Sequence, residues 1–336
     1  MTTAPSAALL LDPEVLSDHR VLEVYGWRAV EAREGLSILP RRDEWLEALG
    51  SGVEAVGLPS RVAEGEFSQA VVHLQKGRAA TQEGLWTAWK NLGLGGRLLL
   101  AGGNELGIKS AVKRLAQELG QEGTLLVNRA RSRVVSFDRT EHPGPEVPTS
   151  AELEVESGGD VFTLRSAIGV FSADRVDRGT RLLLDHLDAV DPPTRILDMG
   201  CGIGVLGLAA LKRWPEVTAV LADVDRRAVE AATRNAVELD LEDRCRTAWW
   251  DAIQEKPPST NCDLVLINPP FHSGKKIDLD PARAMFRSLD QVLAPRGSAL
   301  IVANRTLPYE RQLEGIGRIR MVLDEAGFKL LELAFG

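Results

Sequence analysis

The stretch Thr194-Arg-Ile-Leu-Asp-Met-Gly-Cys-Gly-Ile-Gly204 decides the fold that this sequence predicts. An apolar run ends in an acidic residue, Asp198, and three glycines follow at a spacing of two. Residues 205–213 then continue with helical periodicity. Strand, glycine turn and helix in this order form the first βα unit of a doubly wound sheet, where glycines let a ligand approach the backbone closely. We therefore expect an α/β fold with a ligand at this turn.

Two kinds of cofactor suit such a turn. Gly202-Ile-Gly-Val-Leu-Gly207 satisfies the dinucleotide pattern G-x-G-x-x-G. A dinucleotide, however, places a doubly negative pyrophosphate at the turn and the helix N-terminus, where Asp198 would repel it. S-adenosylmethionine carries no phosphate, and a carboxylate attracts both its α-ammonium and its sulfonium group. Asp198 therefore favours S-adenosylmethionine, and a dehydrogenase is the weaker alternative.

Two further acidic residues follow later strands of the predicted sheet. Asp223 comes directly after the apolar run 217–222 and is placed to accept both ribose hydroxyls of a nucleoside. Asp251 follows the predicted strand 245–249, where it would reach an adenine amino group, with a backbone N–H from Ala252 beside it. A cap of the strand end is the alternative role for Asp251. Together these residues predict a nucleoside site along one sheet edge.

A second motif, Leu264-Val-Leu-Ile-Asn-Pro-Pro-Phe-His272, predicts a buried strand that delivers a rigid loop. Asn268 offers a side-chain carbonyl acceptor, the fixed φ angles of Pro269 and Pro270 stiffen the backbone, and Phe271 supplies a stacking face. An amino group on a planar ring suits this loop, because Asn268 and the Pro269 carbonyl can accept its two hydrogens. A plain strand followed by a Pro-Pro turn is the structural alternative.

The connector between the halves is rich in proline and glycine. His142-Pro-Gly-Pro145 and Pro148 predict a linker. The alternating segments 152–155 and 161–164 around Ser157-Gly-Gly159 then predict a β-hairpin. An amphipathic helix is expected over 180–187, where Thr180 can act as the cap and the free N–H groups suit a polar ligand. The second domain therefore begins near residue 150.

The first half repeats the layout of the second. Strands are expected at 21–24, 70–74 and 97–101, and helices at 81–92 and 109–119, which is α/β patterning. The order strand, helix, Gly95-Gly96, strand parallels the second half, where a helix, Pro295-Arg-Gly297 and an expected strand at 298–302 follow the strand 264–267, so we expect a duplication. No acidic residue with a glycine triplet and no Asn-Pro-Pro-Phe loop occurs there. The first half is expected to contact the substrate, to act as a scaffold, or both.

Composition bounds the class of protein. With 336 residues, 44% hydrophobic and 26% charged, the chain is long enough for two folded domains. No apolar run reaches a membrane span, and no basic residue precedes the N-terminal leucines, so neither a membrane anchor nor a secretion signal is expected. Three cysteines without paired spacing predict neither disulfides nor a metal site. A cytoplasmic, monomeric protein is expected.

The net charge of −8 disfavours a protein that simply coats nucleic acid. Local basic surfaces are still available. Each cluster is either a ligand contact or an ordinary solvated face, and Lys275 and Lys276 are the best placed because they follow the Pro-Pro loop. The clusters are Arg129, Arg131 and Arg133; Lys275 and Lys276; and Arg318 and Arg320.

The motifs of the second half resemble class I S-adenosylmethionine-dependent methyltransferases that act on exocyclic amino groups. Gly169-Val-Phe-Ser172, Asp177-x-Gly-Thr180, Asn268-Pro-Pro-Phe-His272 and Val302-Ala-Asn-Arg-Thr-Leu-Pro-Tyr309 resemble, more narrowly, the bacterial ribosomal RNA guanine-N2 methyltransferases. The likeness extends from about residue 166 to the C-terminus and covers the first half only in layout. Asn-Pro-Pro is shared with adenine-N6 and glutamine-N5 methyltransferases, whereas the other segments narrow the match.

The resemblance implies two tandem doubly wound, Rossmann-like methyltransferase-type domains, the N-terminal one degenerate. The expected boundaries are 1–140 for the degenerate domain, 141–165 for the linker and hairpin, and 166–336 for the catalytic domain. Asn268, Pro269, Pro270 and Phe271 are the implied catalytic residues. The predicted cofactor-binding residues are Phe171, Asp177, Gly179, Thr180, Asp198, Gly200, Cys201, Gly202, Gly204, Asp223, Val224, Asp251, Ala252 and Asn268. Cys201 is expected to fill space in the turn and not to act as a nucleophile.

The expected reaction is methyl transfer from S-adenosylmethionine to the N2 amine of a guanine in ribosomal RNA, with small-subunit RNA favoured. The partner is ribosomal RNA or a ribosomal subunit. Orientation and electrostatics supply most of the rate, and Phe271 stacks on a base that has left its helix. Two alternatives remain open: N5-methylation of a glutamine in a protein, and an RNA-binding assembly factor without activity.

Overall fold

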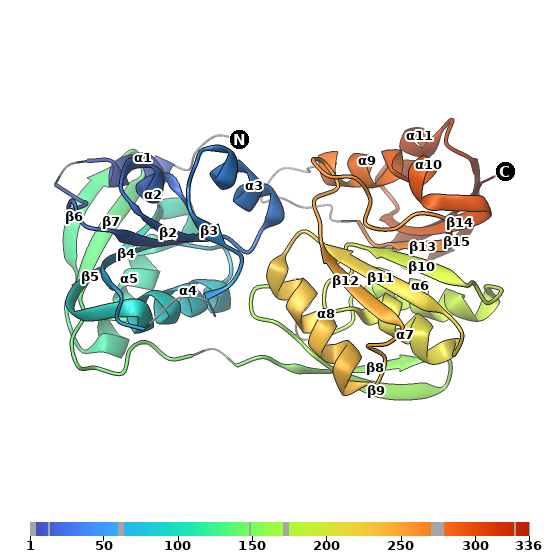
Figure 1. The fold of residues 1–336 in the computed structure, drawn as a ribbon, viewed down its shortest axis with the longest axis horizontal. Helices are drawn as coiled ribbons and strands as arrows, with labels where there is room; N and C mark the ends of the chain where they lie inside the picture. The colour runs from blue at the N-terminus through green and yellow to red at the C-terminus, as the bar shows by residue number, and fades with distance from the viewer. Residues whose placement is uncertain are drawn as a thin grey trace. The chain divides into compact units, whose positions relative to one another are not determined.

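The computed structural model describes residues 5–12, 14–59, 64–147, 149–170, 175–269, 279–325 and 327–335. The chain divides into two compact units, Met1–Thr149 and Ser150–Gly336 (Figure 1). Each unit contains one seven-stranded sheet, and the second also holds a separate two-stranded hairpin. The predicted α/β fold with two similar domains is therefore confirmed.

The sheet of the second unit has the strand order β12-β11-β10-β13-β14-β16-β15. The five strands from β12 to β14 are parallel, and β16 and β15 run antiparallel at one edge. Carboxyl ends of the parallel strands therefore meet at one edge of the sheet. The strands are β10 (Arg195–Met199), β11 (Thr218–Asp223), β12 (Cys245–Trp249), β13 (Cys262–Ile267), β14 (Leu293–Asn304), β15 (Arg318–Glu325) and β16 (Phe328–Ala334).

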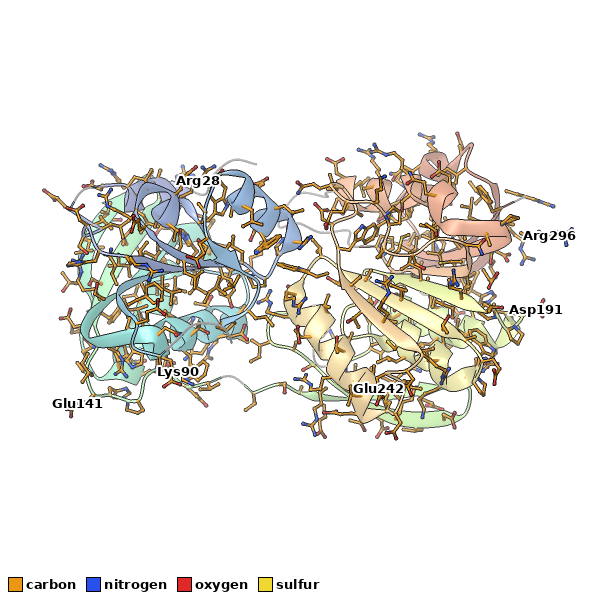
Figure 2. The ribbon with its side chains drawn as sticks, viewed as in Figure 1. Arg28, Lys90, Glu141, Asp191, Glu242 and Arg296 are labelled. Carbon is orange, nitrogen blue, oxygen red and sulfur yellow. The ribbon has the colours of Figure 1, made fainter. Side chains whose placement is uncertain are left out.

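Alternation along these strands builds a core on each face of the sheet. Ile196 and Leu264 belong to one buried cluster, and their neighbours Leu197 and Val265 belong to the other. Figure 2 shows side chains on both faces of the sheet. The helices are α6 (Arg178–His186), the short 3₁₀ helix η3 (Leu187–Ala189), α7 (Val205–Arg213), α8 (Arg226–Glu238), α9 (Asp280–Arg287), α10 (Leu289–Val292) and α11 (Tyr309–Leu313).

The predicted hairpin is present as β8 (Glu152–Ser157) and β9 (Asp160–Arg165). Its inward side chains belong to the same buried cluster as α6 and α7, so the hairpin is part of the second unit. Asn235 of α8 fixes it in place. The Asn235 side chain bonds the backbone N and O of Arg165 at 2.9 and 3.0 Å and donates to the Ile203 carbonyl at 3.0 Å.

The first unit has the corresponding strand order, β3-β2-β1-β4-β5-β7-β6. Its strands are β1 (Val21–Val24), β2 (Gly35–Ile38), β3 (Ala55–Val56), β4 (Phe67–His73), β5 (Leu92–Gly103), β6 (Thr124–Arg129) and β7 (Ser132–Asp138). Its helices are α1 (Pro5–Leu10), α2 (Arg28–Ala32), α3 (Arg42–Gly50), α4 (Arg78–Asn91) and α5 (Ile108–Leu119), with the 3₁₀ helix η2 (Asn104–Leu106). The shared order of seven strands agrees with the predicted duplication.

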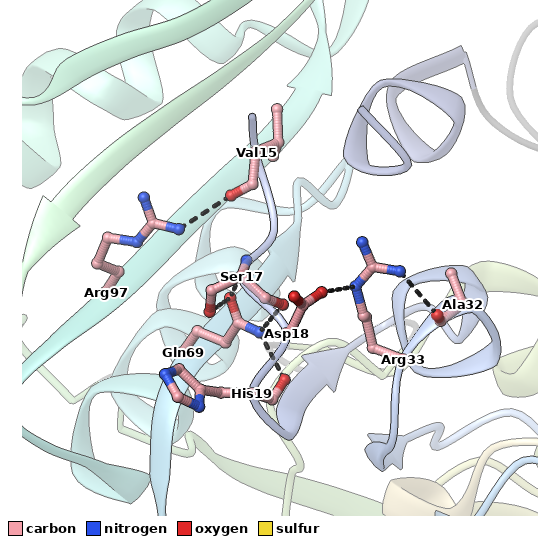
Figure 3. A network of polar contacts seen from close by, with 8 residues as sticks. All are labelled: Val15, Ser17, Asp18, His19, Ala32, Arg33, Gln69 and Arg97. Atoms are coloured by element: carbon pink, nitrogen blue, oxygen red, sulfur yellow. Dashed lines mark hydrogen bonds and ion pairs between the residues drawn. The ribbon is translucent and has the colours of Figure 1, made fainter. Parts of the chain in front are cut away.

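A buried glutamine anchors the segment before β1 (Figure 3). Gln69 on β4 accepts from the Ser17 backbone N–H at 3.1 Å and donates to the carbonyls of Ser17 and His19 at 3.1 and 2.7 Å. Arg97 on β5 donates to the Val15 carbonyl at 3.1 Å. These bonds satisfy the polar groups of a segment that has no strand partner of its own.

The predicted elements are found with shifted ends. The expected helix 81–92 begins three residues earlier, at Arg78, and the expected strand 298–302 is the middle of the longer β14. Predictions from the sequence did not include β2, β3, β6, β7, β15 or β16. In the parts of the chain that the structure describes, no helix has both the length and the apolarity that crossing a membrane requires.

Candidate active site

The glycine turn lies between β10 and α7, as predicted. Gly200, Gly202 and Gly204 have φ angles of 76°, 55° and 94°, which only glycine adopts readily. The amides of Gly200 and Cys201 donate to the Ala222 carbonyl at 2.8 and 3.0 Å, which ties the turn to the end of β11. A Cβ added to Gly202 would meet nothing within 4 Å, so the backbone there faces open space.

Asp198 lies beneath this turn and is almost completely buried, at 1% exposure. Its Oδ2 accepts from the Gly207 amide of α7 at 2.9 Å, whereas Oδ1 has no hydrogen-bond partner among the described residues. Burial, with a smaller contribution from the nearby Asp223 carboxylate, raises the pKa of this carboxyl from 3.8 to about 7, although the hydrogen bond from the Gly207 amide acts to lower it. Asp198 therefore supports the helix start and keeps one acceptor available.

Asp223 ends β11 and reaches back to the glycine turn. Its Oδ2 accepts from the Gly202 amide at 2.9 Å, and its Oδ1 accepts from the Asp225 amide at 2.9 Å. The neighbouring Val224 presents its carbonyl to the indole N–H of Trp249 at 2.9 Å. Two backbone amides thus fix the Asp223 carboxylate at the edge where a ribose was expected. Its contact with the ribose stays a prediction.

Asp251 follows β12 and is buried at 4% exposure. Its Oδ1 accepts from the Ile253 amide at 2.9 Å, so the alternative of a local cap holds for one oxygen. Its Oδ2 is buried and has no partner among the described residues. A buried acceptor without a donor is costly, and an adenine amino group would satisfy it. Ala252, beside it, is partly buried against the second core cluster.

Asn268 directly follows β13 and lies between the sheet and α6. Its Nδ2 donates to Asp177 Oδ1 and Oδ2 at 3.3 and 3.2 Å and to Thr180 Oγ1 at 2.9 Å. Asp177 is also the N-cap of α6 and accepts from the Gly179 and Thr180 amides at 2.9 and 3.3 Å. Asp177, and not Thr180, therefore caps this helix. The structure brings these predicted residues together around the amide of Asn268.

Three predicted site residues, Phe171, Pro270 and Phe271, lie outside the described residues, as do Lys275 and Lys276. Pro269 is described and buried. Of the remaining basic residues, Arg320 pairs with Glu332 across β15 and β16, and Arg129 pairs with Asp12 at 3.2 Å. These two charges are thus partly neutralised within the chain, which weakens the case for a ligand contact there.

The cysteine in the turn is buried, at 7% exposure. Burial, together with the carboxylates of Asp223 and Asp198, raises the pKa of the Cys201 thiol well above its ordinary value, so the thiol stays protonated. This agrees with a space-filling role. No group of three or more metal-ligating side chains occurs within the described ranges.

Three residues at the site were not predicted from the sequence. Gly207 lets α7 approach the sheet, because a Cβ there would lie 2.7 Å from Leu221 and 3.2 Å from Asp198 Oδ2. The Met285 side chain of α9 borders the turn, at 3.4 Å from a Cβ built on Gly200. Asn235 supports the turn from behind. Only Gly207 had a signal, as the third glycine of the pattern at 202–207.

In the first unit, protein side chains occupy the sheet edge that corresponds to the candidate site of the second unit. Val24 pairs with Val72 as Met199 pairs with Ile267, so Glu23 corresponds to Asp198 and His73 to Asn268. Glu23 is fully buried, bonds the Ala29 and Val30 amides of α2 at 2.7 and 3.0 Å, and contacts His73 Nε2 at 2.6 Å.

The turn before α2 also differs, since it has three residues, 25–27, where the second unit has five, 200–204. The His73 ring lies against it, and a Cβ on Gly26 would be only 2.3 Å from His73 Nε2. The acidic residue is thus kept in the first unit, but a side chain occupies the space beside it.

The residues of the second unit fit S-adenosylmethionine. Two buried carboxylate oxygens, Asp198 Oδ1 and Asp251 Oδ2, have no donor among the described residues, and Gly202 in the turn after β10 faces open space. A ligand with cationic groups at one end would be attracted by the charge of Asp198, and an amino group at its other end would donate to Asp251 Oδ2. A pyrophosphate at the turn would meet Asp198 and Asp223 instead. This sheet, with this site, defines a class I S-adenosylmethionine-dependent methyltransferase.

Comparison with known proteins agrees. The methyltransferase small domain family matches residues 161–332. The ribosomal RNA small subunit methyltransferase C of Hahella chejuensis is 32% identical over 272 residues, which cover 80% of this chain and 78% of that protein. The ribosomal RNA large subunit methyltransferase G of Shewanella amazonensis is 30% identical over 239 residues, which cover 70% of this chain and 61% of that protein.

A solved structure is similar over the whole chain. The T. thermophilus 16S rRNA N2 G1207 methyltransferase, in complex with AdoMet and guanosine, has a TM-score of 0.88 and 26% identity. The match covers 100% of this chain and 93% of that one. The chain therefore belongs to the ribosomal RNA methyltransferase family that carries the methyltransferase small domain.

Proposed function

We propose that this enzyme methylates the exocyclic N2 amine of a guanine in small-subunit ribosomal RNA. The observation that carries the proposal is the orientation of Asn268. Its amide nitrogen faces Asp177 and Thr180, which leaves the carbonyl oxygen as the acceptor at the end of β13. An amino group on a planar base is the donor that such an acceptor suits.

The N2 amine of guanine is a poor nucleophile, because its lone pair is delocalised into the ring. A hydrogen bond from one N–H to Asn268 Oδ1 and another to the Pro269 carbonyl would localise the lone pair and fix its direction. S-adenosylmethionine supplies the methyl group, the bonding electron pair stays on the sulfur, and N2 gains the methyl and releases one proton to water. Orientation and electrostatics of this kind need no strong general base.

The acidic residues along the strand ends are the proposed cofactor contacts. Asp223 would accept the ribose hydroxyls, and Asp251 Oδ2 would accept the adenine amino group. The Asp198 carboxylate is buried beneath the turn, so it would act on the cationic methionine portion through its charge. Gly200, Gly202 and Gly204 allow the backbone to approach the ligand.

The small subunit is favoured because the relative of that name is aligned over more of both chains than the large-subunit relative. The T. thermophilus protein, named for N2 of a 16S guanine, supports the same base and the same atom. We further propose that the enzyme acts in the cytoplasm as a monomer. Sedimentation at the chain mass of 36.6 kDa would support the monomer, and a larger mass would contradict it.

The test is transfer of radiolabelled methyl from S-adenosylmethionine to separated ribosomal subunits from cells that lack the gene, followed by nucleoside analysis. Label in N2-methylguanosine of the small subunit is the expected result, with the Asn268→Ala enzyme as the control of strongly reduced turnover. The same nucleoside in the large subunit would overturn the choice of subunit. Label in protein, as N5-methylglutamine, would overturn the choice of substrate.

A further inference from the structure

The hydrogen bonds around Asn268 determine which end of its amide faces the substrate. The carboxylate of Asp177 can only accept, and both of its oxygens lie 3.2–3.3 Å from the Asn268 amide nitrogen. The Thr180 hydroxyl donates its single hydrogen to Asp177 Oδ2. Thr180 Oγ1 can therefore only accept from Asn268, at 2.9 Å. Both neighbours require the NH₂ end of the amide, so one orientation is selected.

A flipped amide would place a carbonyl oxygen against the Asp177 carboxylate and would leave Thr180 without its donor. Like partial charges and a lost donor both disfavour that state. The selected orientation leaves Asn268 Oδ1 near the Cα of Gly179, where a Cβ would be 3.5 Å away. Among the described residues, no donor bonds this oxygen, so it remains available to an incoming amine.

We propose that Asp177 and Thr180 are positioning residues, which act on the methyl acceptor through Asn268. The inference rests on the proposed function, because it assumes that Asn268 Oδ1 accepts from the substrate amine. It assigns to Asp177 and Thr180 a role in turnover that is distinct from the cofactor contact that the family resemblance implies. The start of α6 thereby sets the hydrogen-bonding direction of a residue 88 to 91 positions away.

The sharpest variant is Asp177→Asn. Asparagine caps helices as well as aspartate does, so α6 keeps its start. When the side-chain oxygen of the introduced asparagine takes over the bond from the Gly179 amide, its NH₂ group faces Thr180 and Asn268. The Thr180 hydroxyl is then free to donate, and the flipped amide of Asn268 becomes the better partner. We expect kcat to fall about 10²-fold, comparable to the loss of one preorganised hydrogen bond at a reacting group.

Thr180 provides a matched pair of variants. Thr180→Ser keeps the hydroxyl that accepts from Asn268, and Thr180→Val removes it at nearly equal volume. Turnover of the serine variant should exceed that of the valine variant about tenfold. The dissociation constant of S-adenosylmethionine, measured by calorimetry on each full-length variant, should change less than twofold. A rise in that constant that accounts for the lost activity would instead assign both residues to the cofactor and overturn the proposal.

A double-mutant cycle with Asn268→Ala decides whether the effect passes through Asn268. Once Asn268 is absent, adding Asp177→Asn should lower the residual rate by less than twofold. Two independent losses that multiply would overturn the proposal.

The amide itself gives a second readout, because in protein labelled with ¹⁵N-asparagine the side-chain resonances missing from Asn268→Ala belong to Asn268. They should shift strongly in Asp177→Asn, and unchanged resonances would also contradict the proposal.

Failure of the proposed function looks different from failure of this inference. If the wild-type enzyme methylates another amino group, the double-mutant cycle should give the same result with that substrate. The shift of the Asn268 side-chain resonances should also be the same. If the wild type transfers methyl to N2 of guanine but Asp177→Asn turns over normally, only the positioning role is lost.

Discussion

At the residue scale, we expect a substitution of Asn268 to affect turnover and a substitution of Asp223 to affect cofactor affinity. Asn268→Ala should lower kcat at least about 10²-fold and leave the S-adenosylmethionine dissociation constant nearly unchanged, because its amide acts on the acceptor. Asp223→Ala should raise that dissociation constant about tenfold to a hundredfold, since hydrogen bonds to a charged group contribute about 1.5–3 kcal/mol. Calorimetry and single-turnover kinetics measure the two effects. Loss of cofactor binding in Asn268→Ala would contradict the assignment.

Asp198 should make cofactor affinity depend on pH. Its pKa in the folded protein is raised to about 7, and the cationic ligand favours the ionised carboxylate. Affinity should therefore increase about tenfold between pH 6 and pH 8 as the proton is lost. The dissociation constant of S-adenosylmethionine should be measured across this pH range for the wild type and for Asp198→Asn. Protonation of the ligand itself affects both proteins equally, so the difference between them reports on Asp198. Parallel curves for the two proteins would show that Asp198 is not the titrating group.

The raised pKa of Asp198 also determines how the free energy of unfolding should change with pH. The folded pKa of Asp198 lies above its ordinary value of 3.8, so the folded chain holds this proton more tightly than the unfolded chain does. Its contribution to the free energy of unfolding is complete below pH 4 and is lost as the pH rises to about 7. Bound S-adenosylmethionine should offset the loss.

The sequence predicted the residues at strand ends, because glycine, aspartate and proline have local signatures. Asp198, Asp223 and Asn268 each follow an apolar run, and parallel strands bring their carboxyl ends together without further information. The partner that orients Asn268 could not be predicted in the same way. Asp177 lies 91 positions away, and its contact depends on where α6 docks on the sheet. The buried pair in the first unit was missed for the same reason.

At the element scale, the hairpin β8–β9 supports the glycine turn through one side chain. Asn235→Ala removes one buried hydrogen bond to the Ile203 carbonyl and two partly buried hydrogen bonds to the Arg165 backbone, which leaves these backbone groups without their partner. We expect the free energy of unfolding to fall by at least about 2 kcal/mol, at about 1–3 kcal/mol for each unsatisfied group. Thermal unfolding measures the change, with the exposed Asn128→Ala as the matched control.

The turn should loosen as well, because Ile203 belongs to it. The dissociation constant of S-adenosylmethionine should rise in Asn235→Ala even at temperatures where the variant is fully folded. An unchanged constant together with reduced stability would limit Asn235 to a role in folding.

Helices and strands with a clear pattern of apolar residues in the sequence were predicted, and those without such a pattern were not. The core strands β10, β11 and β13 each contain adjacent buried apolar residues, as buried parallel strands usually do. The edge strand β15 has exposed or half-buried residues throughout and no clean alternation, so it gave no strand signal. The prediction for β14 omitted its first residues, 293–297, because Pro295 and Gly297 are unusual inside a strand.

At the scale of the whole molecule, one chain should bind one S-adenosylmethionine. The second unit has an open turn of five residues with two unpartnered acceptors among its described residues, whereas His73 fills the corresponding space in the first unit. Calorimetric titration should give a stoichiometry of one per chain. At ligand concentrations that saturate the wild type, Asp223→Ala should show greatly reduced binding. A stoichiometry of two would place a working site in the first unit.

The Glu23–His73 pair makes a cofactor site in the first unit hard to reach by evolution in single steps. Replacing His73 alone would remove the partner of a buried Glu23 carboxylate, and replacing Glu23 alone would remove the acceptor of two amides at the start of α2. Neither single step restores the missing residues of the glycine turn. A route that begins with either single replacement therefore passes through a less stable protein. Once this side chain had filled the space, selection on stability alone would have kept the first copy closed and left it to diverge in other roles.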